Sequence, residues 1–339
     1  MGSYLSKNEF PVEGRTIVVT GGSRGMGLAV ARQLAARGAN VAIVARDTER
    51  LQQAIERIKG EATKPQTQRF HMISADLTLP AESTRVIDEV VAWNSGNPPD
   101  TVWCCAGTSH PTLFVDTPVS RFEEQMNSNY FTSLYTAHAT LICWLKGPKG
   151  TNVEGGKTRT GSPGPSPPRH IVFTASFLAF YSFAGYSPYS PCKAALRALS
   201  DNLSQEMNLY AAAYPDEPRI RFHTIFPATI LGEAYEAENR VKSDLTKLLE
   251  GTDEGQEPDV IAAKSIRGLE RGRELITTDF LTALVQRGVL GGSVRGGVLR
   301  ALSDWVLVWL MGIAMVFVRD DMDRKTRAWG RKYGPTGMK

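Results

Sequence analysis

Three side chains in the middle of the sequence could transfer a proton to a carbonyl oxygen. Tyr189 and Lys193 are four residues apart, which places them on one face of a helix, and Ser176 precedes them, just after the apolar run IVFTAS. A ketone that accepts hydride becomes an alkoxide and needs a proton. Tyrosine can supply it if a nearby ammonium and the positive nicotinamide of an oxidised cofactor lower its pKa from about 10. Ser176 would stabilise the developing charge on the oxygen. The competing interpretation is a packed tyrosine and a capping serine.

A glycine-rich stretch near the start could bind a dinucleotide. It reads TGGSRGMG and stands between an apolar run and a helical pattern. Glycines there allow a sharp turn and close approach to a pyrophosphate, which rests on a helix N-terminus. The spacing differs from G-x-G-x-x-G, so the prediction depends on position in the chain, and the alternative is an ordinary glycine-rich turn. The candidate residues of this turn are Gly21, Ser23, Arg24, Gly25 and Gly27.

Two arginines favour NADPH over NADH as that dinucleotide. Arg46 ends the second predicted strand, where an acidic residue would bind the ribose of NAD and an arginine accommodates a 2′-phosphate. Arg24 adds a second cation, and the alternative is that both are solvated surface residues. Asp76, after the third predicted strand, is expected to bind the adenine amino group, with Leu77 beside it in the cofactor site. The alternative role for Asp76 is a helix N-cap.

A parallel sheet would bring these residues together. Apolar runs predict strands at 15–20, 39–45, 69–74, 101–105, 170–175, 219–226 and 274–278. Helical patterns fill the gaps at 25–37, 47–60, 81–94, 119–146, 187–213 and 257–272. This alternation predicts an α/β fold, a Rossmann-like doubly wound parallel sheet of about seven strands with helices on both faces. Ser176 then lies at the carboxyl edge of the sheet, where ligands bind.

Composition narrows the class of protein. The chain has 339 residues, 42% of them hydrophobic and 22% charged, which fits one large domain with an appendage. A net charge of +4 is too small and scattered to predict nucleic-acid binding. The cysteines have no metal-ligand spacing, so we expect reduced buried thiols and no metal site. They are Cys104, Cys105, Cys143 and Cys192. Gly2 fits only a loose myristoylation pattern.

Two segments interrupt the alternation. Residues 147–169 are rich in Gly, Pro, Ser and Lys and predict a flexible insertion outside the pocket. Residues 305–318 (WVLVWLMGIAMVFV) carry no charge but are shorter than the roughly 17–25 residues of a spanning helix. They could form a buried core helix, an oligomer interface or a membrane-embedded helix. Two tryptophans and flanking basic residues favour an interfacial or re-entrant membrane helix.

Together, the glycine turn, Ser176, Tyr189 and Lys193 resemble the short-chain dehydrogenase/reductase family over roughly residues 15–280. The resemblance implies an oxidoreductase with a fourth catalytic residue, an asparagine that holds a proton-relay water. Asn129 matches its position, and Asn127 is the less favoured candidate.

The sequence departs from the family pattern in two places. The family's Asn-Asn-Ala-Gly appears as CCAG at 104–107, so the stabilising asparagine side chain is absent while Gly107 is still expected to contact the cofactor. The family's Pro-Gly after the sixth strand appears as Pro227-Ala228, and Pro227 is expected to pass close to the nicotinamide.

Outside the catalytic motif, residues 228–256, 268–280 and the apolar tail resemble one group within the family, the 3-ketodihydrosphingosine reductases, most of all the fungal ones. The resemblance implies NADPH-dependent reduction of a long-chain sphingoid ketone, 3-ketodihydrosphingosine, to dihydrosphingosine (sphinganine) in sphingolipid synthesis. It also implies residence at the endoplasmic reticulum membrane with the catalytic domain facing the cytosol. The aromatic stretch 177–186 would suit an apolar substrate.

These expectations divide the chain into two regions. Residues 1–280 form the NADP-binding domain, with 228–256 as a substrate lid, and 281–339 form a helical region that contacts the membrane surface through 305–318. The family often dimerises through helices equivalent to 119–146 and 187–213, so a homodimer is possible. Two alternatives stay open: a reductase of another apolar ketone, such as a steroid or fatty-acyl derivative, and a non-catalytic, membrane-bound, cofactor-sensing scaffold.

Overall fold

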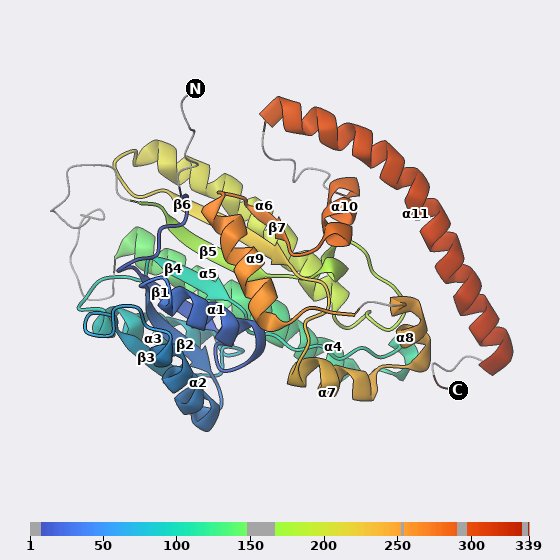
Figure 1. Ribbon diagram of the computed structural model, residues 1–339, viewed down its shortest axis with the longest axis horizontal. Coiled ribbons are helices and arrows are strands. Elements are labelled where there is room, and N and C mark those ends of the chain that lie inside the picture. The colour runs from blue at the N-terminus through green and yellow to red at the C-terminus, as the bar shows by residue number, and fades with distance from the viewer. Residues whose placement is uncertain (1–7, 148–166, 252–253, 290–296, 334–337, 339) are drawn as a thin grey trace.

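The computed structural model describes residues 8–147, 167–251, 254–289, 297–333 and 338 (Figure 1). Its centre is one sheet in which all seven strands are parallel, in the order β3-β2-β1-β4-β5-β6-β7. Each predicted strand is present, which confirms the doubly wound α/β fold. The strands are β1 Thr16–Thr20, β2 Asn40–Ala45, β3 Phe70–Ser74, β4 Thr101–Cys104, β5 Arg169–Thr174, β6 Ile220–Phe226 and β7 Leu275–Thr277.

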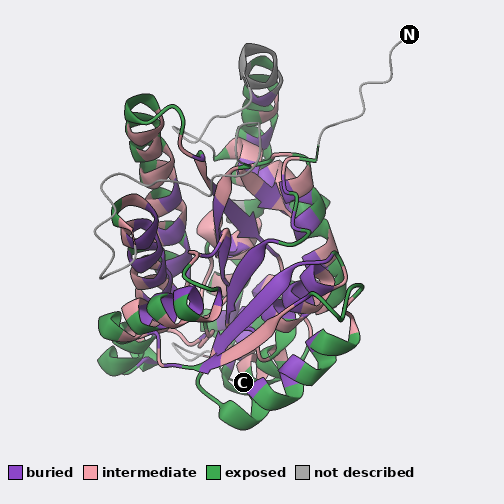
Figure 2. Ribbon diagram, turned by 90° about the vertical axis from the view of Figure 1, so that its left-hand side faces the viewer, coloured by how far each residue is buried: buried purple, intermediate pink, exposed green. Residues whose placement is uncertain are grey.

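Helices cover both faces of this sheet, and Figure 2 shows the strands buried between them. One face carries α1 (Gly25–Ala35), α2 (Thr48–Gly60) and α9 (Pro258–Glu270). The other face carries α3 (Pro80–Trp93), α5 (Thr132–Lys146) and α6 (Ser190–Ala213). The strands are apolar throughout because a parallel sheet is buried on both sides.

The strand order changes direction between β1 and β4. From β1 the chain adds β2 and β3 on one side of the sheet, and from β4 it adds β5, β6 and β7 on the other side. A crevice at the carboxyl ends of the strands is the expected ligand site at such a reversal. The glycine turn follows β1, and residues 105–107 follow β4, so both line this crevice.

The predicted helix 119–146 is interrupted in the structure. It begins as α4 (Val119–Met126), passes through a π-helical stretch at Asn127–Phe131, and continues as α5. A π-helical turn within an α-helix often marks a functional site, because the extra residue frees backbone groups and redirects side chains. The interruption falls on the two asparagines that the sequence singled out.

Two short helices, α7 (Glu233–Val241) and α8 (Asp244–Glu250), lie within 228–256, the segment predicted to be a substrate lid. The lid packs closely on the loop before α6. Gly185 has φ +99°, and a Cβ there would lie 2.1 Å from the Thr246 Oγ1. Only glycine therefore fits at this contact between the loop and α8.

The C-terminal region consists of α10 (Phe280–Gly288) and α11 (Gly297–Tyr333), and Figure 1 shows α11 running along one side of the molecule from α10 toward α8. Trp305, Trp309 and Phe317 are 62%, 64% and 69% exposed, so the core-helix interpretation of 305–318 is wrong. In the parts of the chain that the structure describes, no helix has an apolar stretch sufficient to cross a membrane. The predicted insertion, apart from its ends, and Gly2 lie outside the described residues.

Both ends of α11 contact other parts of the chain. Near its start, the Asp304 Oδ1 lies 3.7 Å from the Arg287 Nε of α10. Near its end, the Tyr181 hydroxyl donates a hydrogen bond to the Met322 sulfur at 3.0 Å, and Trp329 packs against apolar residues of α8. The apolar helix is therefore in direct contact with the lid.

Candidate active site

The three predicted catalytic side chains meet at the carboxyl edge of the sheet. Ser176 follows β5, and its hydroxyl oxygen accepts a hydrogen bond from the Leu178 amide at 3.2 Å. Ser176 thus caps the following turn, and its side chain is also near enough to the Tyr189 phenol to lower the pKa of that group. Lys193 donates from Nζ to the Thr174 carbonyl at 3.0 Å and lies 5.3 Å from the centre of the Tyr189 ring.

Burial determines the proton affinities of this group. It raises the pKa of Tyr189 above its ordinary value, with the negative charge of Glu238 as the next cause, while the hydrogen bond from Ser176 opposes the change. Burial also lowers the pKa of Lys193 to about 8. In the chain without cofactor, loss of water around the phenol dominates its pKa, and the lowering expected from Lys193 together with the oxidised nicotinamide stays a prediction. A raised pKa keeps Tyr189 protonated, as the acid in a reduction must be.

Asn129 is the asparagine that belongs to the site. It is fully buried in the π-helical stretch, whereas Asn127 is exposed. Its Nδ2 donates to the Thr108 carbonyl at 2.8 Å and to the Gln125 carbonyl at 2.9 Å, and its Oδ1 accepts from the Thr108 amide at 3.2 Å. These bonds hold the loop after β4 against the interrupted helix.

Gly107 stands between Asn129 and Lys193. A Cβ at Gly107 would lie 2.6 Å from the Asn129 Oδ1 and 3.5 Å from the Lys193 Nζ, so the site has no room for a side chain there. Cys105 takes the place of a family asparagine, and its sulfur accepts a hydrogen bond from the Thr174 hydroxyl at 3.4 Å. Burial raises the pKa of the Cys105 thiol to about 12, so it stays neutral.

The glycine turn has the shape that a pyrophosphate requires. A Cβ at Gly27 would lie 2.2 Å from the Gly21 carbonyl oxygen, so the turn closes only because Gly27 lacks a side chain. Gly25, with φ +52°, opens onto free space. Arg24 is the N-cap of α1 and makes no side-chain capping bond, which leaves amide groups of the first turn available to an anion. The turn therefore fits a dinucleotide.

Charged side chains from three parts of the chain lie near the glycine turn. Arg46 directly follows β2 and is exposed. Arg24 lies 3.6 Å from Glu233 of the lid, and Arg50 of α2 bonds the same carboxylate at 2.7 Å. The sequence did not single out Arg50 or Glu233, because their proximity to Arg24 depends on how α2 and α7 pack.

The remaining predicted cofactor residues follow strands β3 and β6 at the carboxyl edge of the sheet. The Asp76 Oδ1 accepts hydrogen bonds from the Thr78 amide and hydroxyl at 3.1 and 2.8 Å, which forms a turn before α3. The N-cap of α3 is Leu79, so the helix-cap role for Asp76 is wrong. Leu77 is buried in the core. Pro227 follows β6, and its carbonyl accepts from the Phe177 amide at 2.9 Å, which ties it to the turn that carries Ser176.

A buried cluster of ionisable side chains, absent from the sequence-based catalytic set, lies between the lid and the catalytic tyrosine. The Tyr186 hydroxyl oxygen lies 2.6 Å from Glu238 and within hydrogen-bonding distance of Glu250, and its one proton can be donated to either. The ring centre of Tyr186 lies 6.3 Å from that of Tyr189. The Lys242 Nζ lies 3.1 Å from Glu238 and 2.7 Å from Glu250. The sequence marked residues 238–240 and Lys242 only as polar lid residues.

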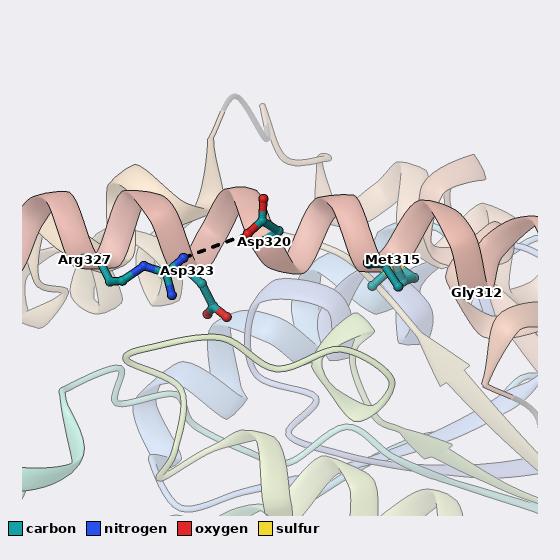
Figure 3. Close-up of a pocket in the computed structure, with 6 residues that line it drawn as sticks. Gly312, Met315, Asp320, Asp323 and Arg327 are labelled. Atoms are coloured by element: carbon teal, nitrogen blue, oxygen red, sulfur yellow. Dashed lines mark ion pairs between the residues drawn. The ribbon is translucent and has the colours of Figure 1, made fainter.

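A separate hollow of about 440 Å³ lies along α11 (Figure 3). Figure 3 shows Gly312 at one end and Arg327, in an ion pair with Asp320 at 3.9 Å, at the other. All the lining residues belong to α11, so this hollow is distinct from the catalytic crevice.

Comparison with known proteins indicates the same enzyme family as the arrangement of these residues. The short chain dehydrogenase family matches residues 15–160. A 3-ketodihydrosphingosine reductase of Aspergillus fumigatus is 48% identical over 96% of this chain and 88% of that protein. A 3-ketodihydrosphingosine reductase of Neurospora crassa is 40% identical over 98% and 87%.

Solved structures share the fold at lower identity. A short-chain dehydrogenase/reductase of Mycobacterium marinum has a TM-score of 0.63 at 21% identity, over 80% of this chain and 96% of that one. An alcohol dehydrogenase of Thermococcus sibiricus, solved with 5-hydroxy-NADP, has a TM-score of 0.57 at 20% identity, over 78% and 96%. With its parallel sheet, its glycine turn and its Ser176, Tyr189 and Lys193, the chain belongs to the short-chain dehydrogenase/reductase family and groups there with the fungal 3-ketodihydrosphingosine reductases.

Proposed function

We propose that this chain reduces 3-ketodihydrosphingosine to dihydrosphingosine with NADPH. The observation that carries the proposal is the placement of Lys193 and Ser176 beside Tyr189, in a chain that matches reductases of this name along nearly its whole length. The intact catalytic set argues against a non-catalytic scaffold. The lid and tail, which resemble these reductases, argue against a reductase for steroids.

Each residue of the site has a separate role in the reduction. The nicotinamide, when bound, supplies the hydride to the carbonyl carbon. Ser176 donates a hydrogen bond to the carbonyl oxygen and stabilises the charge that develops there. Tyr189 gives that oxygen its proton, and Lys193 stabilises the resulting phenolate. Asn129 holds the loop that carries Gly107 and positions a water for proton return.

The preference for NADPH rests on the arginines near the glycine turn. Arg24 and Arg46 stand at the two places from which a guanidinium can reach a 2′-phosphate, and forked N–H donors suit that group. Arg50 adds a third cation beside Arg24, through their shared partner Glu233. A phosphate bound at Arg24 would compete with Glu233 for the guanidinium, so the lid and the cofactor would share Arg24 as a binding partner.

We also propose that α11 rests on a membrane surface. Its exposed apolar side chains include the paired rings of Trp305 and Trp309, 6.3 Å apart, and such residues favour the interface between lipid and water. The opposite end of α11 packs on the lid, so a lipid substrate could enter from the surface that the helix touches. Location on the cytosolic face of the endoplasmic reticulum and assembly as a homodimer stay predictions.

The test compares ketones and variants. The full chain in lipid vesicles should oxidise NADPH with 3-ketodihydrosphingosine and not with a panel of ketosteroids. Tyr189→Phe should lower kcat by about 10²- to 10⁴-fold, the usual contribution of a positioned acid, while NADPH binding measured by fluorescence is unchanged. Faster turnover of a steroid than of the sphingoid ketone would contradict the proposal, as would full activity of Tyr189→Phe.

A further inference from the structure

We propose that Glu238 of the lid is a specificity residue that binds the ammonium group of the substrate. The inference rests on the proposed function and goes beyond it, because neither Ser176, Tyr189 nor Lys193 distinguishes an amino ketone from any other ketone. It assigns that distinction to a carboxylate on α7, next to the catalytic tyrosine.

The cluster around Glu238 has an excess of negative charge. Two carboxylates, Glu238 and Glu250, share one ammonium, that of Lys242, whose side chain is only 1% exposed. Its carboxylate partners raise the pKa of Lys242 against the effect of burial, so it stays cationic. The Tyr186 hydroxyl lies within hydrogen-bonding distance of both carboxylates, so its single proton is donated to one of them at a time. It stays neutral, because burial and the two negative charges raise its pKa. One negative charge is therefore left without a counterion inside the cluster.

This excess charge lies beside the reacting group. Tyr186, which contacts Glu238, has its ring centre 6.3 Å from that of Tyr189. Of the two carboxylates, Glu238 is the one whose charge acts on the Tyr189 phenol. A cation held between Glu238 and Tyr189 would supply the missing counterion and would also ease formation of the phenolate.

The substrate carries a cation at that distance from its carbonyl. In 3-ketodihydrosphingosine the amine-bearing carbon is bonded directly to the carbonyl carbon, the same N–C–C=O unit as in a peptide residue. Its nitrogen therefore lies about 3 Å from the carbonyl oxygen, by standard bond lengths. With that oxygen on Tyr189 and Ser176, the ammonium faces the lid side of the tyrosine, where Glu238 lies. Primary amines of this kind are largely protonated near neutral pH.

If the cluster had a purely structural role, loss of its carboxylates would affect the two kinds of substrate differently from what we propose. If the carboxylates serve only to fix Lys242 and Tyr186, their loss affects all substrates alike, because it disturbs the lid itself. If Glu238 binds the ammonium, its loss affects only substrates that carry an amine. The two roles separate when a second ketone is used that matches the first in chain length and hydroxyl group but lacks the amine.

The experiment measures kcat/KM for both ketones in the wild type, Glu238→Gln and Glu250→Gln. The wild type should prefer the amino ketone. Glu238→Gln should lower kcat/KM for it by about 10- to 100-fold, as expected when a hydrogen bond to a charged group is lost. The amine-free ketone should change much less, because for it only the effect of the Glu238 charge on the Tyr189 phenol is lost. Glu250→Gln is the matched control, since it removes an equal charge from the same Lys242 and Tyr186. It should keep the preference for the amine.

Several outcomes would overturn the inference: equal losses on both ketones in Glu238→Gln, no amine preference in the wild type, or loss of that preference in Glu250→Gln alone. Should Glu238→Gln fail to fold, inhibition of the wild type gives the answer. A long-chain primary amine should inhibit more tightly than the alcohol of equal length, and equal inhibition counts against the role of Glu238. If the wild type reduces neither ketone, the proposed function itself fails.

Discussion

Replacing Lys193 with methionine should make the cofactor-free protein more stable at neutral pH and less active. Burial lowers the pKa of Lys193 from its ordinary 10.5 to about 8, so the folded chain holds the ammonium at a cost. At about 1.4 kcal/mol for each tenfold change in proton affinity, this cost is about 3 kcal/mol at pH 7. Loss of the bond to the Thr174 carbonyl offsets about 1 kcal/mol. The expected net gain in the free energy of unfolding is about 2 kcal/mol.

The pH dependence of this gain follows from the direction of the pKa change. Between about pH 8 and 10.5 the unfolded wild type still holds the Lys193 proton while the folded wild type has lost it. The unfolded state then binds more protons, so the stability of the wild type rises with pH in this window. The advantage of Lys193→Met should be full below about pH 8 and should disappear as pH approaches 10.5. Other groups titrate in both proteins, and their effects cancel in the difference.

Urea unfolding at pH 7 and pH 10, without cofactor, measures this difference directly. Lys242→Met is the matched control, because Lys242 is equally buried but is paired with two carboxylates. Removing one member of a buried ion pair should destabilise the protein by about 3–5 kcal/mol, the opposite sign. A destabilised Lys193→Met at pH 7, or a stability difference from wild type that does not change with pH, would refute the reasoning.

Three further predictions concern the cofactor turn and the tail. Arg46→Asp should weaken NADPH binding far more than NADH binding in fluorescence titrations, and equal effects would exclude the 2′-phosphate role. Gly27→Ala places a Cβ against the backbone of its own turn and should weaken both dinucleotides and destabilise the protein by about 1–3 kcal/mol, whereas Gly60→Ala, in open space, should change neither binding nor stability by more than about 1 kcal/mol. Trp305→Asp with Phe317→Asp should reduce co-sedimentation with vesicles and leave unfolding unchanged, because both side chains are exposed. Unchanged sedimentation would argue against the membrane surface.

Hydrophobic runs and helical spacing in the sequence were sufficient to predict most strands and helices of the fold. All seven strands and the six main helices lie where apolar runs and helical spacing placed them, because a sheet buried on both faces requires continuous apolar strands. The interruption at Asn127–Phe131 was not predicted, since a π-helical turn has the same side-chain pattern as the helix around it. The sequence also did not decide whether residues 305–318 are buried or exposed, because an apolar helix has the same sequence pattern whether protein, lipid or water covers it.

For the site, the sequence by itself determined the chemistry that resides in residue types and short spacings: Tyr189 and Lys193 one helical turn apart, Ser176 at a strand end, and glycines where a Cβ would block the turn. Tertiary structure alone decided the environment of those groups. Burial, which no spacing reveals, raised the pKa of Tyr189 and lowered that of Lys193. Packing of distant segments brought Glu233 to Arg24 and Arg50, and joined Tyr186, Glu238, Lys242 and Glu250 beside the catalytic tyrosine. Coulomb interactions depend on distance and solvent in three dimensions, so the charge that would recognise the substrate emerges only on folding.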